Sequence, residues 1–120
     1  AALIQGNPNL DAIFVTNANG ALGAAAAVRE AGKTDTIKVI GFDTDGGMFE
    51  AIDNGEIFCT AKQGAYNMGF WSMQFLSCVK NDLVNPVDGW REKGLNPLPV
   101  SVDTGVTIVD KDNLSAYYSK

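Results

Sequence analysis

The fold is decided by the stretch I-K-V-I-G-F-D-T-D-G-G, residues 37–47. An apolar run gives way abruptly to acidic residues and glycines, which is typical of a buried parallel strand that carries carboxylates at its carboxyl end. Open α/β sheets bind their ligands at that end. Asp43, the first of these acids, is therefore a candidate for one of two roles. It could be the nucleophile of a phosphoryl-transfer enzyme, or it could accept hydrogen bonds from the hydroxyls of a small molecule.

Outward from this stretch, predicted strands alternate with predicted helices. Apolar runs bounded by turn residues predict strands, and an alanine-rich run ended by Gly32 predicts a helix. The strands are Ala12–Val15, Ile37–Phe42 and Ile57–Ala61, with helices at 21–31 and 48–52 between them. The alternation and the short loops predict an α/β fold, a Rossmann-like parallel sheet flanked by helices with right-handed crossovers.

The pattern changes beyond the third predicted strand. Residues 66–80 predict an amphipathic helix, whose apolar face includes Tyr66 and Phe70. Residues 81–99 contain three prolines and no hydrophobic period, so they predict a connection longer than compact domains usually contain. A final strand over 102–109 and a short helix over 113–118 are predicted to follow.

Composition limits the partners of the chain. Its 120 residues are 46% hydrophobic and 19% charged, and the formal net charge is −5 with nine basic residues scattered singly. This balance argues against nucleic acid and anionic lipid as partners. There is no apolar run of about 20 residues, as a membrane helix requires, and no signal-peptide pattern. The first methionine is Met48, so we expect the chain to be processed or cut from something longer.

Two residue types limit the chemistry. The chain has no histidine, which removes the usual general base and the commonest metal ligand. We therefore expect no catalysis, no metal and no cofactor. Cys59 lies in an apolar strand-like run and Cys78 late in a helix, so both are expected to be buried free thiols rather than a disulfide.

A planar polar side chain follows each of the three predicted strands, namely Asn17, Asp43 and Gln63. Because the carboxyl ends of parallel strands share one edge of the sheet, the three side chains are expected to line one rim. Amides donate and accept, and a carboxylate accepts from two hydroxyls at once, so the trio suits the vicinal hydroxyls of a polyol. The simpler alternative is that Asn17 caps the next helix, that Asp43 or Asp45 caps the helix at Met48, and that Gln63 is solvated.

An enzymatic interpretation competes for the same acids. The run F-D-T-D-G-G at 42–47 resembles the first motif of the haloacid dehalogenase superfamily, in which an apolar strand leads into D-x-D-G-T. That resemblance implies a phosphatase with Asp43 as nucleophile and Mg²⁺ at the phosphate. However, Gly47 stands where the motif has Thr, and no acidic pair for the metal follows. A calcium-binding EF-hand loop is excluded, because Asn54 occupies the position of its last ligand, Glu.

Five motifs in register resemble another family. They are F-V-T-N-A-N-G-A-L-G-A (14–24), V-I-G-F-D (39–43), A-I-D-N-G-E-I (51–57), A-K-Q-G-A-Y-N-M-G-F (61–70) and V-D-T-G-V-T-I-V (102–109). In order and spacing they are similar to the C-terminal part of type I periplasmic sugar-binding proteins, the ribose, galactose and autoinducer-type receptors of ABC importers. The resemblance implies a receptor for a sugar or sugar-like molecule, which serves an ABC permease or a membrane sensor. It further implies a periplasmic or other extracytoplasmic location, with lipid anchoring as one option.

The resemblance also implies an organisation. The family has two Rossmann-like lobes that close on a sugar and are joined by three hinge crossovers. Residues 1–62 would belong to an incomplete C-terminal lobe, 63–101 to a hinge crossover with a helix and connection of the N-terminal lobe, and 102–120 to the return across the hinge and a C-terminal helix. The N-terminal lobe would then be a separate chain or a lost segment. Carried over residue by residue, ligand binding falls on the same trio, Asn17, Asp43 and Gln63.

Departures from the family pattern concern the ligand. The family often has Asp at the position of Ala18 and Asn at the position of Gly64, so the resemblance does not specify the sugar. Phe14, Phe42 and Phe70 are expected to lie in the core rather than to stack on a sugar.

A relative of the same fold is the second alternative. The effector-binding domains of lactose-repressor-type transcription factors typically carry P-P-L-T-T before the hinge glutamine, where this chain has N-G-E-I-F-C-T (54–60). The exported receptor is therefore the favoured interpretation. A helix-turn-helix encoded before Ala1 would support the repressor, and a signal peptide or lipid-attachment cysteine would support the receptor.

Overall fold

The computed structural model describes residues 1–85 and 87–118 of a chain that divides into two compact units. One unit comprises Ala1–Lys62 together with the chain from Val106 onward, and the other comprises Gln63–Gly105. No helix in the described residues has the length and hydropathy that a membrane crossing demands.

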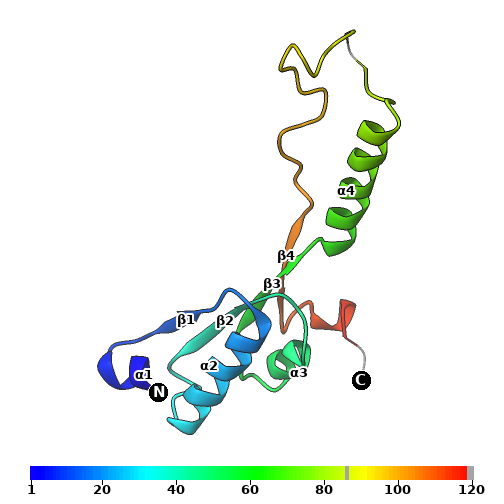
Figure 1. Ribbon diagram of the computed structural model, residues 1–120. Coiled ribbons are helices and arrows are strands. Elements are labelled where there is room, and N and C mark those ends of the chain that lie inside the picture. The colour runs from blue at the N-terminus through cyan, green and yellow to red at the C-terminus, as the bar shows by residue number, and fades with distance from the viewer. Residues whose placement is uncertain (86, 119–120) are drawn as a thin grey trace. The chain divides into compact units, whose positions relative to one another are not determined.

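The first unit is an α/β sheet with helices packed on it (Figure 1). Parallel pairing joins β1 to β2 and β2 to β3, which confirms the predicted parallel α/β sheet. The four strands lie in the order β1-β2-β3-β4, and their bounds are Ala12–Phe14, Lys38–Phe42, Cys59–Gln63 and Val106–Asp110. The helices are α1 (Ala2–Gly6), α2 (Ala18–Glu30) and α3 (Met48–Asp53), and a single 3₁₀ turn, η1, spans Leu114–Ala116.

The helix α2 forms and ends as its residues dictate. Its alanines favour the helix, and its buried side chains recur every three or four residues, so one face turns to the sheet. Gly32 follows the last turn with φ +65°. The N–H of Gly32 donates to the Arg29 carbonyl at 2.9 Å, and that of Lys33 donates to the Val28 carbonyl at 3.0 Å. This pair of bonds is a Schellman motif, which gives partners to carbonyls that the helix leaves unpaired.

The core of the first unit lies between the sheet and the helices α2 and α3. Its least exposed large side chains include Val39 of β2, Met48 and Ile52 of α3, and Val109 of β4. Gly41 of β2 is buried and lies opposite Thr60 in the strand register. A Cβ built at Gly41 would overlap Met48 Cε and would lie 3.2 Å from the Thr60 Oγ1. The glycine therefore allows α3 and the Thr60 side chain to approach β2 closely.

The second unit consists of α4 (Ala65–Lys80) and the connection that follows it. The N–H of Gly64 donates to the Gly105 carbonyl at 2.8 Å, and Asn67 Nδ2 donates to the Thr104 carbonyl at 3.2 Å. The start of the helix and the end of the connection therefore lie side by side. A Cβ at Gly64 would overlap the Thr104 carbonyl oxygen, so only glycine allows this approach.

Several sequence predictions differ from the structure, and the third strand spans Cys59–Gln63 rather than Ile57–Ala61. The last strand starts at Val106 rather than at residue 102, because the Asp103 carboxylate accepts from the Gly105 N–H at 2.8 Å and Gly105 has φ +85°, which forms a turn. The predicted terminal helix is reduced to η1 within the described residues. Both cysteines are free, but Cys78 is only half-buried while Cys59 is buried.

The packing at Gly41 predicts opposite effects for two glycine substitutions. Gly41→Ala should lower the free energy of unfolding by about 1–3 kcal/mol, because the new methyl group overpacks the core. Gly23→Ala, at an exposed position of α2 with no atom within 4 Å of the new Cβ, should raise it by about 0.5–1 kcal/mol. Urea denaturation of both variants checks the pair, and a Gly41→Ala protein as stable as the parent would contradict the packing described.

Candidate functional site

The three predicted site residues lie at or shortly after the carboxyl ends of three strands, although β3 runs to Gln63 and not, as predicted, to Ala61. Asn17 comes shortly after β1, Asp43 directly follows β2, and Gln63 is the last residue of β3. By contacts Asn17 and Asp43 lie in the first unit, whereas Gln63 is the first residue of the second.

Asn17 has the structural role that the simpler alternative predicts. It is the N-cap of α2, with extended backbone, and its Oδ1 accepts a hydrogen bond from the Gly20 N–H at 2.7 Å. Such a cap stabilises a helix by about 1 kcal/mol. The cap uses only the amide oxygen, and the side chain is exposed. The Nδ2 group can therefore still donate to a ligand while the oxygen holds the helix.

Asp43 does not cap a helix start. The N-cap of α3 is Gly47, and α3 has no side-chain cap hydrogen bond. Asp43 instead has φ +71°, in the left-handed region that costs most side chains about 1–2 kcal/mol and that Asp and Asn tolerate best. Its side chain is half-buried.

The backbone on both sides of Asp43 is bonded to β3. The Asp43 N–H donates to the Ala61 carbonyl at 3.0 Å, and the Asp43 carbonyl accepts from Thr60 Oγ1 at 2.7 Å. The peptide planes before and after this residue are both held, which determines the direction of its Cα–Cβ bond. Sequence reasoning missed Thr60; the signal available was a hydroxyl residue inside an apolar strand.

Within the first unit, the loop that follows β2 approaches the start of α2, the helix that follows β1. A Cβ built on Gly46, in the loop after β2, would lie 3.6 Å from Oδ1 of Asn19, the second residue of α2. The parallel pairing of β1 with β2 continues past the end of β1, since the Val15 N–H donates to the Ile40 carbonyl at 2.9 Å. The carboxyl ends of β1 and β2 are therefore adjacent, as a shared ligand-binding rim requires.

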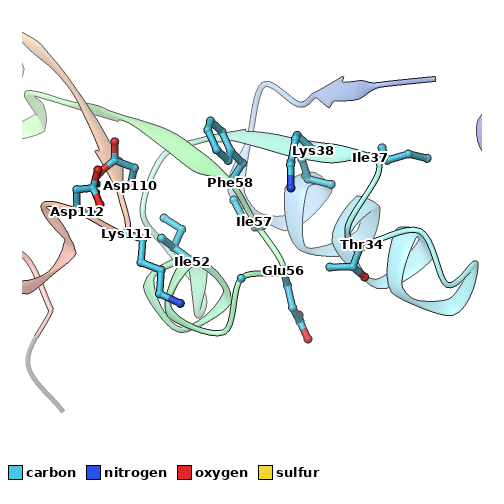
Figure 2. A pocket seen from close by; sticks show the side chains of 12 residues that line it. Thr34, Ile37, Lys38, Ile52, Glu56, Ile57, Phe58, Asp110, Lys111 and Asp112 are labelled. Atoms are coloured by element: carbon cyan, nitrogen blue, oxygen red, sulfur yellow. Dashed lines mark hydrogen bonds between the residues drawn. The ribbon is translucent and has the colours of Figure 1, made fainter. Parts of the chain in front are cut away.

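A hollow of about 290 Å³ in the first unit lies at the amino-terminal ends of β2 and β3 (Figure 2). It is lined by Lys38, the first residue of β2, by Phe58, which precedes β3, and by Asp110–Asp112. None of the three predicted site residues lines it. Parallel sheets bind ligands at the carboxyl ends of their strands, so the position of this hollow does not favour it as the ligand site.

Cys59, the first residue of β3, offers no reactive thiolate. Burial, and secondarily the negative charge of Asp110, raise the pKa of the Cys59 thiol above its ordinary value. Cys59 therefore stays protonated at neutral pH, whereas a nucleophile or metal ligand must be a thiolate. Among the described residues, no group of three or more Cys, Asp and Glu could hold a metal ion.

The aromatic residues expected in the core are not buried. Phe14 is 60% exposed and Phe70 43% exposed, and Phe42 is partly exposed. Alternation along β1 explains Phe14: its neighbour Ile13 packs against the core, so Phe14 points to the face of the sheet opposite α2 and α3.

Comparison with known proteins gives consistent matches along the chain. A model of the periplasmic binding protein domain matches residues 1–79. The D-ribose/D-allose-binding protein of Pseudomonas aeruginosa is 32% identical over 74 residues, which are 62% of this chain and 23% of that protein.

Solved structures extend the likeness over nearly all residues. A sugar-binding protein of a sugar ABC transporter from Bacillus halodurans has a TM-score of 0.80 at 41% identity, covering 98% of this chain and 39% of that one. AraP, an arabinose binding protein from Geobacillus stearothermophilus, has a TM-score of 0.79 at 38% identity, with the same coverage. The chain thus spans 23–39% of the length of these proteins.

The left-handed backbone at Asp43 predicts an unusual order of stabilities. Asp43→Gly and Asp43→Ala both remove the carboxylate, but only glycine adopts φ +71° without steric cost. We expect the glycine variant to be more stable than the alanine variant by about 1 kcal/mol, the reverse of the usual order. Urea denaturation of the unliganded protein measures the difference. An alanine variant at least as stable as the glycine variant would show that Asp43 is not held in this conformation.

Proposed function

The chain belongs to the periplasmic binding protein domain family, and from that premise we propose that it is part of a two-lobed receptor that binds a sugar without altering it. The receptor would deliver the sugar to an ABC importer or present it to a membrane sensor. Relatives named for ribose, allose and arabinose binding support a sugar as the ligand class. The matched family consists of binding proteins rather than enzymes, and its location is extracytoplasmic; lipid anchoring remains one option for this receptor.

Asp43 is the principal ligand residue in this proposal, and its held conformation is the observation that carries it. A residue kept in a costly backbone conformation by two hydrogen bonds, at the edge where parallel sheets bind ligands, suggests function. A carboxylate accepts from two neighbouring hydroxyls at once, and hydrogen bonds to a charged group are about twice as strong as neutral ones.

Asn17 and Gln63 complete the proposed set of ligand residues. Asn17 would donate from Nδ2 to a sugar oxygen while its Oδ1 caps α2. Gln63, half-buried at the end of β3, would both donate and accept. These residue types suit an uncharged polyol, in which each hydroxyl is both donor and acceptor.

The lobe assignment is also a proposal. We assign residues 1–62 to a C-terminal lobe, 63–101 to a crossover and part of an N-terminal lobe, and 102–120 to the return. The exposure of α4 supports this assignment, because Tyr66 is 82%, Met73 66% and Leu76 65% exposed in a helix with no buried residue. Such a face needs a partner, and the rest of an N-terminal lobe would cover it. Sugar binding would then select the closed arrangement of the lobes.

The two alternatives have weaker support. A haloacid-dehalogenase-like phosphatase needs acidic ligands for Mg²⁺ near Asp43, and the described residues contain no such group. A lactose-repressor-type effector domain shares the fold, but the three relatives reported above are all named as sugar-binding proteins. One is named for D-ribose and D-allose, one for a sugar ABC transporter and one for arabinose. Both observations favour the receptor.

Sugar binding by the complete receptor tests the proposal. Calorimetry with D-ribose, D-allose and arabinose should find at least one ligand, and Asp43→Asn should weaken its binding on the order of a hundredfold. The amide keeps one acceptor oxygen but removes the negative charge and the second acceptor, and a loss of about 3 kcal/mol corresponds to that factor. Asparagine tolerates the left-handed conformation, so the melting temperature should change little.

Asp45→Asn is the matched control, since it makes the same change in the same loop at an exposed position. It should leave sugar affinity unchanged. Hydrolysis of p-nitrophenyl phosphate in Mg²⁺, abolished by either substitution, would favour the phosphatase instead, in which the second acid has a catalytic role.

A further inference from the structure

Thr60 stands apart from the other residues of the core. It is the one buried polar side chain among residues 1–85 and 87–118, with 0% exposure. Gly41 lies opposite it in the strand register, and a Cβ built on Gly41 would meet the Thr60 Oγ1 together with side-chain atoms of Ala21 and Met48. Burial of a hydroxyl opposes folding unless the hydroxyl is hydrogen-bonded, and valine would fill the same volume without a polar atom. Packing alone therefore does not account for a hydroxyl at this position.

The explanation lies in what the hydroxyl contacts. Thr60 Oγ1 donates to the main-chain carbonyl of Asp43 at 2.7 Å, across the β2–β3 pair. The Ala61 carbonyl, one residue further along β3, accepts from the Asp43 N–H at 3.0 Å. The bond to Ala61 joins two backbone groups and continues the hydrogen-bond ladder between β2 and β3. The bond from Thr60 is additional to that ladder, because its donor is a side chain.

The two bonds have different consequences for Asp43. The ladder bond holds the peptide plane before Asp43, and the Thr60 bond holds the plane after it. With both planes held, φ stays at +71° and the Cβ of Asp43 keeps one direction. Without the Thr60 bond, the plane after Asp43 could rotate toward a conformation that L-residues prefer, and the carboxylate would move with it.

Gly41 makes this contact possible. It lies opposite Thr60 in the register, and a Cβ there would come within 3.2 Å of Oγ1. A larger residue at position 41 would push the hydroxyl away from its acceptor. The glycine and the threonine thus act as a pair that holds the residue following β2.

From these contacts we infer that Thr60 is the positioning residue for the ligand-binding carboxylate of Asp43. This inference rests on the proposed sugar-binding function. Thr60 touches no ligand itself; it keeps the Asp43 carboxylate in the orientation that accepts two sugar hydroxyls, so that binding does not have to order it. The specificity of the site for vicinal hydroxyls would depend on this buried hydroxyl.

The test uses Thr60→Val, which keeps the shape and removes the donor, and Thr60→Ser, which keeps the donor. In the complete receptor, titrated with whichever of D-ribose, D-allose and arabinose binds the parent protein, Thr60→Val should weaken affinity about tenfold or more. Thr60→Ser should restore most of it. In an Asp43→Asn background, Thr60→Val should have far less additional effect, because the two residues act through one group.

The opposite results would overturn the inference. If Thr60→Val lowered the melting temperature but left affinity intact, Thr60 would be structural only. The same conclusion would follow if its effect on affinity were undiminished in the Asp43→Asn background.

A second measurement does not depend on the sugar. Backbone scalar couplings and ¹³C shifts of Asp43 report φ in the unliganded protein. They should change in Thr60→Val and stay near the parent values in Thr60→Ser. If they stay unchanged in Thr60→Val, the inference is wrong even where sugar binds. If no sugar binds the parent protein but the shifts change as expected, the proposed function fails and the positioning of Asp43 by Thr60 stands.

Discussion

The parallel pairing of β2 with β3 is the constraint on which the rest of the structure depends. Its register sets Gly41 opposite Thr60 and Phe42 opposite Ala61. At the residue after β2, the same ladder continues with a hydrogen bond from the Asp43 N–H to the Ala61 carbonyl. A slip of one residue would turn every side chain of β2 to the other face and would remove Thr60 from the Asp43 carbonyl. The core packing and the candidate site therefore rest on one set of backbone hydrogen bonds.

Much of this arrangement could be predicted from the sequence, because hydrophobic runs and glycine punctuation are local signals. The existence of three strands and their parallel pairing followed from the three apolar runs and the short loops between them. The strand-end positions of Asn17, Asp43 and Gln63 followed from the same pattern. Their role in ligand binding stays a prediction.

Other features depend on contacts that a sequence does not display. The structure shows that Asn17 caps α2 through its amide oxygen, a contact that the sequence left as one of two alternatives, and the ligand role of Asn17 stays a prediction. The sequence alone did not distinguish a ligand residue from a helix cap at Asp43. The left-handed backbone of Asp43 is held by hydrogen bonds to β3, which a sequence does not display. Phe14 was expected in the core, yet alternation alone does not say which face of a sheet is covered. The turn at Asp103 shortens β4 through a single side-chain bond.

A crystal structure of the complete receptor with its sugar is the decisive test of whether the Asp43 carboxylate binds the sugar. We expect two adjacent sugar hydroxyls to lie about 2.5–3.0 Å from the two carboxylate oxygens of Asp43, which retains its left-handed backbone. A sugar bound in the hollow beside Lys38 and Phe58, or anywhere out of reach of Asp43, would contradict it.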